Sequence, residues 1–555
     1  MTVSNPKSLS EQAAELMSMI EKDPKPVIDP TLPYASVRQP VMGDCAVATS
    51  QPLAAQAGMA MLHADGTAVD AAIAAAMVLT VVEPTGCGLG SDGYALVWDG
   101  TELHGLNASG RSPEGWTPER FAGADAMPQR GWDSVTVPGA VSGWIALWKR
   151  FGTLPLEQLA APAIRIADEG FPVSPVIAKL WANGAKQLGT QPGFADCFLP
   201  GGTAPLAGQR MRLPGHARTL RAIVATEGEA FYRGEVAEAI AAAAKANGAV
   251  LSVGDLAAHE AEWVAPISTE FAGYRIHEIP PNGQGLGALI SLGVLDRLGW
   301  KDGVPDDPAT MHLAIEAVKL GLVDAYEHIA DLGHMRHAPA DFLTPDYLAE
   351  RAALVDPLRA GDPGHGTPKP GGTVYLSTAD REGRMVSFIQ SNFMGFGSGA
   401  VVPDWGISMQ NRGAGFSLDP AHVNVVAPRK KPFQTIIPCF ATDAKGQPAM
   451  SFGVMGGPMQ AQGHLQMALR VLGFGQNPQA AADAPRWRVT AGRGVAIEST
   501  FDEKLAAQLA AMGHELNRES PDAVFGFGGA QLIQRTDAGY VAGSDPRKDG
   551  LALAF

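Results

Sequence analysis

Cysteines are scarce in this sequence. The 555 residues contain four, Cys45, Cys87, Cys197 and Cys439, and no two have the CxxC spacing that zinc sites use. Disulfide frameworks belong to short, cysteine-dense secreted chains. A disulfide scaffold and a cysteine zinc site are therefore not indicated, and we expect four reduced thiols.

Long apolar runs and a secretory signal are also missing. No run of 18 apolar residues occurs, because the alanine-rich stretch 68–83 contains Asp70 and ends at Glu83-Pro84. Residues 1–7 lack the basic-then-apolar order of a signal peptide. We therefore expect no membrane association and a cytoplasmic location.

Positive charge is in the minority. Lys and Arg number 42 against 57 Asp and Glu, which gives a net charge of −15. Such acidity favours solubility and opposes binding to nucleic acid. The 46% hydrophobic content supplies a large core.

Several catalytic motifs are absent or stand in the wrong context. There is no GxSxG, so an α/β-hydrolase is not favoured. His334 and His337 form HxxH without the acid of HExxH, and we expect neither metal nor cofactor. Gly88, Gly90 and Gly93 match GxGxxG, but they follow a predicted helix and open a predicted strand. A dinucleotide site needs the reverse order, so a tight packing loop is the better interpretation.

The periodicity of apolar residues predicts strands and helices in runs. We expect helices at 53–63, 67–82 and 459–472, and strands at 94–98, 102–107, 267–279, 373–379, 385–391, 435–441 and 449–454. Strict βα alternation is missing, which favours stacked sheets covered by helices.

The most informative linker precedes Thr373. Residues 356–372 read DPLRAGDPGHGTPKPGG, too rich in proline and glycine for a helix or a central strand. Cleavage between Gly372 and Thr373 would free an α-amine of near-neutral pKa to activate the threonine hydroxyl. Glycine tolerates the strained backbone that such a cleavage requires. A Gly-Thr pair that simply starts a strand is the alternative.

A second glycine pair lies between a predicted strand and a predicted helix. Gly456 and Gly457 offer two backbone N–H groups for the oxyanion of a tetrahedral intermediate. A plain strand-to-helix turn is the alternative.

The chain resembles the gamma-glutamyltransferase family of N-terminal-nucleophile hydrolases over about residues 43–550. The segments that carry the resemblance keep their order along the chain: residues 52–93, DSVTVPGAVSGW (133–144), PPNGQG (280–285), HLAIEAVKLGLVDAY (312–326), GGP (456–458), APRW (484–487) and GSDPRKDG (543–550).

This resemblance implies a fold and a set of roles. The fold is a four-layer αββα sandwich, and the chain divides into a lead (1–42), a large chain (43–372) and a small chain (373–555). The two chains stay associated as a heterodimer. The implied roles are the nucleophile for Thr373, its support for Ser391, the oxyanion hole for Gly456 and Gly457, and a clamp on the substrate carboxylate for Arg111.

The sequence departs from the family where substrates are recognised. Val374-Tyr375 replaces Thr-His after the nucleophile, and Phe393 replaces an asparagine. Arg412 and Gly415 replace the glutamine and aspartate that hold an α-amino group, and Gln434-Thr435 replaces Ser-Ser. The short segment 416–432 leaves no room for a lid loop. An arginine in place of an ammonium partner favours an anion. The pattern resembles divergent members such as oxamate amidohydrolases and glutaryl-cephalosporin acylases.

We therefore hypothesise an autoprocessed threonine amidohydrolase acting through an acyl-enzyme. Its substrate would be a small amide that carries a carboxylate: oxamate-like, glutaryl-like or gamma-glutamyl. One alternative is a genuine gamma-glutamyltransferase or glutathione hydrolase. An alternative of another class is a non-catalytic homologue that binds a small acid.

Overall fold

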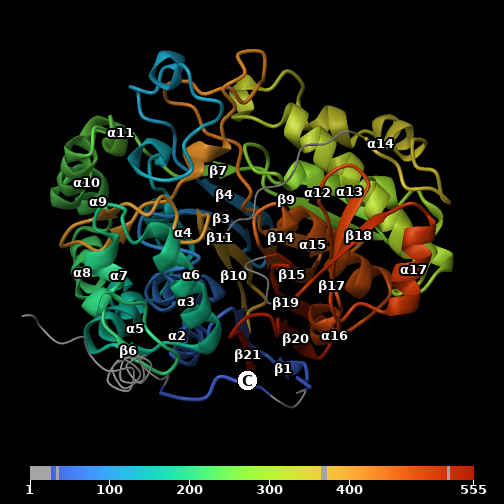
Figure 1. Cartoon of the computed structure of the whole chain (residues 1–555). Helices are drawn as coiled ribbons and strands as arrows, with labels where there is room; N and C mark the ends of the chain where they lie inside the picture. Colours follow the sequence, from blue (N-terminus) through green and yellow to red (C-terminus); the bar gives the residue numbers. More distant parts are fainter. Residues whose placement is uncertain (1–26, 33–36, 364–371, 522–525) are drawn as a thin grey trace, which may run out of the picture.

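Two stacked seven-stranded sheets form the centre of the molecule, and helices cover both outer faces (Figure 1). The computed structural model describes residues 27–32, 37–363, 372–521 and 526–555. The predicted αββα sandwich is confirmed. Much of the lead (1–42) and of the linker before Thr373, Gly371 included, lies outside the described residues.

The first sheet holds Thr373 in a central strand, and we call it the β10 sheet. All its neighbouring strands pair antiparallel. Its strand order is β21 (Leu551–Ala554), β2 (Ala46–Thr49), β10 (Gly372–Ala379), β11 (Met385–Phe393), β3 (Asp92–Trp98), β4 (Leu103–Ala108), β7 (Glu262–Val264).

The second sheet, the β15 sheet, is also antiparallel throughout. Its order is β1 (Val41–Gly43), β20 (Gly539–Ser544), β19 (Gly529–Thr536), β15 (Pro448–Met455), β14 (Cys439–Thr442), β9 (Tyr274–Glu278), β8 (Ile267–Phe271). The apolar residues between the two sheets include Tyr94, Tyr375, Ile389, Phe440 and Ile533, all fully buried.

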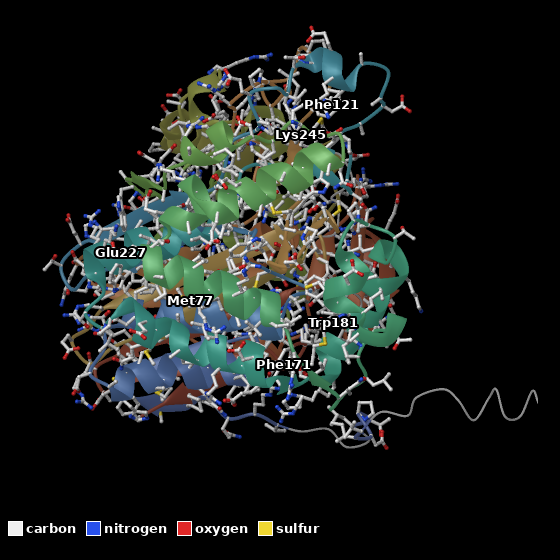
Figure 2. All side chains as sticks on the ribbon, turned by 90° about the vertical axis from the view of Figure 1, so that its left-hand side faces the viewer. Met77, Phe121, Phe171, Trp181, Glu227 and Lys245 are labelled. Atoms are coloured by element: carbon white, nitrogen blue, oxygen red, sulfur yellow. The ribbon has the colours of Figure 1, made fainter. Side chains whose placement is uncertain are left out.

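Helices from the first half of the chain cover the β10 sheet. The helix α3 (Ala68–Val82) is buried along its whole length, because it packs on the sheet and against α2, α4 and α5. A capping box of Thr67 and Asp70 starts it. Figure 2 views this layer from outside, where Glu227 and Lys245 are exposed and Met77 of α3 is buried. The other helices here are α2 (Pro52–His63), α4 (Ala140–Phe151), α5 (Leu156–Glu169), α6 (Pro175–Leu188), α7 (Phe194–Phe198), α8 (Pro214–Thr226), α9 (Glu229–Arg233), α10 (Glu235–Ala246) and α11 (Val253–Ala257).

A second helical layer covers the β15 sheet on the right of Figure 1. It consists of α12 (Gly285–Leu295), α13 (Pro308–His328), α14 (Pro345–Ala352), α15 (Met459–Ala468), α16 (Pro478–Asp483) and α17 (Glu503–Ala511). A small sheet of β16 (Trp487–Val489), β17 (Gly494–Glu498) and β18 (Glu515–Glu519) lies beside them. No described helix combines the length and apolar character needed to cross a membrane.

The structure corrects three predicted elements. Strand β14 begins at Cys439 instead of residue 435, because the backbone of Gln434 bonds to residues 282 and 284 outside the sheet. Residues 267–279 form a hairpin, β8 and β9, instead of one strand. The helix predicted at 459–472 changes at Leu469 into a π-helical turn, Leu469–Gly473.

Candidate active site

Thr373 lies at an irregularity in the sheet. The register between β10 and β11 shifts between Gly372 and Val374, which places Thr373 in a bulge, a common way to direct a side chain next to an active site. Thr373 is fully buried, and its Oγ1 donates to the Gly372 carbonyl at 2.7 Å. The hydroxyl therefore lies beside the peptide bond that sequence analysis predicts to be cleaved.

Ser391 on β11 brings a second hydroxyl to the same point. Its Oγ donates to the Gly372 carbonyl at 2.6 Å and lies 3.1 Å from Thr373 Oγ1. The backbone N–H of Phe393 donates to this Oγ at 2.8 Å and fixes its position. Two hydroxyls thus converge on one carbonyl oxygen, and the structure brings together the predicted nucleophile, its predicted support and the predicted scissile bond.

Gly456 and Gly457 form the turn between β15 and α15. Their φ angles of 121° and 63° are in the region that favours glycine. Among the hydrogen bonds of the described residues, none uses the N–H of either glycine, whereas both carbonyls accept bonds from the first turn of the helix. Two free N–H groups at a helix start suit an oxyanion.

Sequence analysis missed two glutamines at this site. Gln460 on α15 donates from Nε2 to Thr373 Oγ1 at 3.3 Å and accepts from the Ile437 N–H at 3.0 Å. Gln284 at the start of α12 donates to the carbonyls of Gly457 (2.9 Å) and Thr435 (2.5 Å). The available signal was the position of Gln460, one turn after the glycine pair, together with the PPNGQG segment that contains Gln284.

A cavity of about 280 Å³ adjoins this group of residues. Two of its lining residues connect it to Thr373 and the glycine pair: Phe393, whose N–H donates to Ser391 Oγ, and Pro458, which follows Gly457. Its walls are mainly apolar and aromatic, as in most small-molecule sites. They are formed by Tyr326, Ile329, Phe393, Ala414, Gly415, Phe416, Ser417, His422, Asn424, Phe433, Thr435 and Pro458.

Arg412 lies behind this wall. Its side chain is buried, its Nη1 donates to Thr435 Oγ1 at 2.9 Å, and its guanidinium carbon lies 5.0 Å from the centre of the Phe393 ring. Gln434 turns away from Thr435 and donates to Asp92 Oδ2 at 2.6 Å. The predicted Gln434-Thr435 pair is therefore divided, and only Thr435 borders the cavity.

Asp92 is a buried acid that sequence analysis did not select. Its Oδ1 accepts the N–H groups of Gly110 (3.3 Å) and Gly139 (3.1 Å). Burial raises the pKa of Asp92 to about 7, although the charge of Arg412 and these hydrogen bonds act in the opposite direction. Asp92 therefore changes its charge near neutral pH beside the buried arginine.

Arg111 does not join the cavity. Its side chain is 42% exposed, with Nη1 2.8 Å from Asp331 and Nη2 3.1 Å from Glu262, and it also donates to the Arg429 carbonyl. It does not line the 280 Å³ cavity. We predicted that Arg111 holds the substrate carboxylate. In the structure its guanidinium is already paired with two acids, Asp331 and Glu262.

The two remaining motifs, GxGxxG and HxxH, lie in surroundings that indicate a structural role. The GxGxxG loop leads into β3, and a Cβ at Gly88 or Gly90 would collide with Ser408, so close packing explains these glycines. His334 lies at an exposed turn, 4.0 Å from Asp331, and neither His334 nor His337 belongs to a group with metal-ligand spacing among the described residues.

Comparison with known proteins gives a consistent picture. The family model for gamma-glutamyltranspeptidase matches residues 54–555. The chain is 36% identical to the oxamate amidohydrolase proenzyme of Klebsiella pneumoniae over 91% of this chain and 97% of that protein. It is 31% identical to the acylase ACY 1 proenzyme of a Pseudomonas strain, over 92% and 93%. The crystal structure of a cephalosporin acylase from Bacillus halodurans superposes with a TM-score of 0.91 at 46% identity, covering 95% of this chain and 99% of that one. The chain belongs to the gamma-glutamyltranspeptidase family.

Proposed function

We propose that this protein is an amidohydrolase that cleaves its own Gly372–Thr373 bond and then uses Thr373 as its nucleophile. The observation that carries the proposal is the convergence of the Thr373 and Ser391 hydroxyls on the Gly372 carbonyl. Similarity to proenzymes named amidohydrolase and acylase supports it.

The self-cleavage step follows from these contacts. Thr373 Oγ1 attacks the carbonyl carbon of Gly372, and the Ser391 hydroxyl stabilises the negative charge on the carbonyl oxygen. The C–N bond breaks, the nitrogen takes a proton, and an ester joins Gly372 to the threonine oxygen. Water hydrolyses that ester, which leaves a carboxylate on Gly372 and a free α-amine on Thr373.

The same residues then act on an external amide. The α-amine takes the proton of Thr373 Oγ1 as this oxygen attacks the substrate carbonyl. The free N–H groups of Gly456 and Gly457 stabilise the oxyanion. The amine leaves with a proton, and water releases the acyl group from the threonine.

We propose a small amide that carries a carboxylate as the substrate. The cavity beside Phe393 and Thr435 measures about 280 Å³, which suits a short acyl group. The buried positive charge of Arg412 next to this wall favours an anion. Relatives named oxamate amidohydrolase and cephalosporin acylase support this class of substrate.

We also propose that the large and small chains stay associated as a heterodimer after cleavage. In the β10 sheet, β10 from the small chain pairs with β2 from the large chain, and β11 from the small chain pairs with β3 from the large chain. Separation would break these ladders inside the core. A cytoplasmic location is part of the proposal, and cell fractionation tests it.

Two alternatives make different predictions. A genuine gamma-glutamyltransferase would prefer gamma-glutamyl amides and accept amine acceptors, and a relative named glutathione hydrolase, from Bacillus subtilis, is 28% identical. A non-catalytic binding protein would remain a single chain. Amide hydrolysis with and without an amine acceptor separates the first alternative from our proposal.

Intact-mass measurement of purified protein tests the central step. We expect two chains, the smaller beginning at Thr373, and one chain for Thr373→Ala. Active wild-type protein that remains one uncleaved chain would overturn the proposal.

A further inference from the structure

Arg412 carries unpaired hydrogen-bond donors in the interior. Its side chain is 1% exposed, and only Nη1 has a hydrogen-bond partner, Thr435 Oγ1 at 2.9 Å. Among the described residues, Nε and Nη2 have none, and no acid lies within ion-pair distance of this guanidinium. Buried donors are nearly always satisfied, and a guanidinium is shaped to hold a carboxylate with two N–H groups. The unpaired donors therefore indicate a missing anionic partner.

Asp92 does not fill this place. Its Oδ1 already accepts two backbone N–H groups, and its Oδ2 accepts the amide of Gln434 at 2.6 Å. It acts on Arg412 through space, as the mutual effect on their pKa values indicates, but it makes no hydrogen bond to the guanidinium. Nε and Nη2 therefore stay without a partner among the described residues, behind the cavity wall that Phe393 and Thr435 form, and a substrate carboxylate that moves this wall would pair with them.

The position of Arg412 connects this anion site with the nucleophile. Two residues that its side chain contacts, Phe393 and Thr435, are both walls of the 280 Å³ cavity. Phe393 donates its N–H to Ser391 Oγ, which lies 3.1 Å from Thr373 Oγ1. A carboxylate at Arg412 would therefore belong to an acyl group whose carbonyl reaches Thr373.

Among the described residues, the cavity walls offer an ammonium group no ion-pair partner. None of the described residues that line the cavity is Asp or Glu. An acid at position 415 would not fit, because a Cβ on Gly415 would lie 2.6 Å from the Phe433 carbonyl oxygen. A buried ammonium would lose its water without gaining an ion-pair partner, next to a like charge.

We infer that Arg412, oriented by Thr435, binds the carboxylate of the substrate's acyl group, so that the substrates are half-amides of short dicarboxylic acids without an α-amino group. Arg111, which two acids already neutralise, does not serve this role. The inference rests on the proposed amidohydrolase function and specifies its substrate class.

Three p-nitroanilides test the inference: glutaryl, gamma-glutamyl and butyryl, which differ only in the carboxylate and the amino group. We expect wild-type kcat/KM to be highest for the glutaryl compound. Arg412→Gln should lower that value about 10- to 150-fold, the usual effect of losing hydrogen bonds to a charged group. Hydrolysis of the butyryl compound should change less than about threefold. Arg111→Gln, the matched control, should leave the glutaryl-to-butyryl ratio unchanged.

A milder variant covers the case in which Arg412→Gln does not fold or self-cleave. Thr435→Val keeps the size of the side chain but removes the acceptor that orients Arg412, and it should lower only the glutaryl value. Free glutarate should inhibit butyryl hydrolysis competitively in wild-type protein and weakly in Thr435→Val.

The outcomes separate the inference from the proposed function. A wild-type chain that neither self-cleaves nor hydrolyses any of the three anilides contradicts the amidohydrolase proposal itself. A wild-type enzyme that prefers the gamma-glutamyl compound, or that loses its glutaryl preference through Arg111→Gln and keeps it in Arg412→Gln and Thr435→Val, overturns the assignment of Arg412 alone.

Discussion

The side-chain amide of Gln460 donates a hydrogen bond of 3.3 Å to Oγ1 of Thr373. An amide nitrogen is a donor only, so the threonine hydroxyl must direct its own proton to another acceptor. The Gly372 carbonyl and the Ser391 hydroxyl are the acceptors within reach. Gln460 thereby orients the hydroxyl whose oxygen we propose as the nucleophile.

Replacement of Gln460 should slow catalysis without weakening substrate binding. Gln460→Met keeps the volume but removes one hydrogen bond to Oγ1, so we expect kcat to fall about 2- to 13-fold with little change in KM. Gln462→Met is the matched control: Gln462 lies on the same helix, is buried, and likewise accepts a backbone N–H, from Val489. Equal losses of kcat in both variants would assign Gln460 a purely structural role.

Ser391→Ala should impair self-cleavage. The variant removes the hydroxyl that donates to the Gly372 carbonyl at 2.6 Å, and loss of one oxyanion donor typically costs about 100- to 1000-fold in rate. The rate is measured from the appearance of the small chain over time. Ser387→Ala, on the same strand but bonded to the Tyr375 hydroxyl, should cleave at the wild-type rate. Normal cleavage in Ser391→Ala would remove Ser391 from the mechanism.

Gln284→Met should loosen the turn of Gly456 and Gly457, whose N–H groups we propose as the oxyanion hole. The variant leaves the carbonyls of Gly457 and Thr435 without their side-chain donor, so we expect kcat to fall about tenfold or more. Thermal unfolding of the variant and of the wild-type protein, measured alongside activity, distinguishes a lower catalytic rate from a loss of folded protein. A loss of activity that follows only the fraction of unfolded protein would contradict a positioning role for Gln284.

Asp92 should make binding of carboxylate substrates depend on pH. Its pKa is raised to about 7, so below this pH the acid is neutral and the charge of Arg412 is uncompensated. As the pH rises through about 7, Asp92 ionises and offsets that charge, so KM for glutaryl-p-nitroanilide should rise relative to KM for the butyryl compound. Tyr94 and Tyr232, which also face Asp92, have pKa values raised well above neutrality by burial and stay uncharged.

The variant Asp92→Asn should remove this pH step. The comparison uses the ratio of the two KM values, because the α-amine of Thr373 titrates near neutral pH and affects both substrates equally. An unchanged step in Asp92→Asn would assign the titration to another group.

Asp545→Asn should destabilise the fold. Asp545 lies 2.5 Å from Arg486, and both side chains are buried, so the change leaves an uncompensated charge at a cost of about 3–5 kcal/mol. The charges of Arg486 and Arg547 lower the pKa of Asp545, although burial opposes them, so its contribution is present above about pH 4 and is lost as pH falls through about 2. Urea unfolding measures the loss. Arg493→Gln, which breaks the exposed pair with Glu515, should cost less than about 1 kcal/mol.

The local elements and the chemistry of the cleavage site could be predicted from neighbouring residues in the chain. The helices at 52–63 and 68–82 and the hairpin of β3 and β4 follow from apolar periodicity and from the turn residues between them. Thr373 was identifiable because a Pro/Gly linker gives way abruptly to a strand, and the order of the motifs indicated the family and hence the αββα sandwich.

Which side chains meet at the site became visible in the folded molecule. Arg111 and Arg412 both lie at positions that the family resemblance assigns to substrate binding. No local sequence pattern reveals that Arg111 pairs with two acids, whereas Arg412 is buried with two unpaired donors. Gln460 reaches Thr373 across 87 residues of sequence, and Asp92 reaches Gln434 across 342. Side-chain hydrogen bonds and desolvation depend on how distant segments pack, whereas periodicity and turn chemistry are properties of neighbouring residues, and for that reason the elements were predictable and the substrate subsite was not.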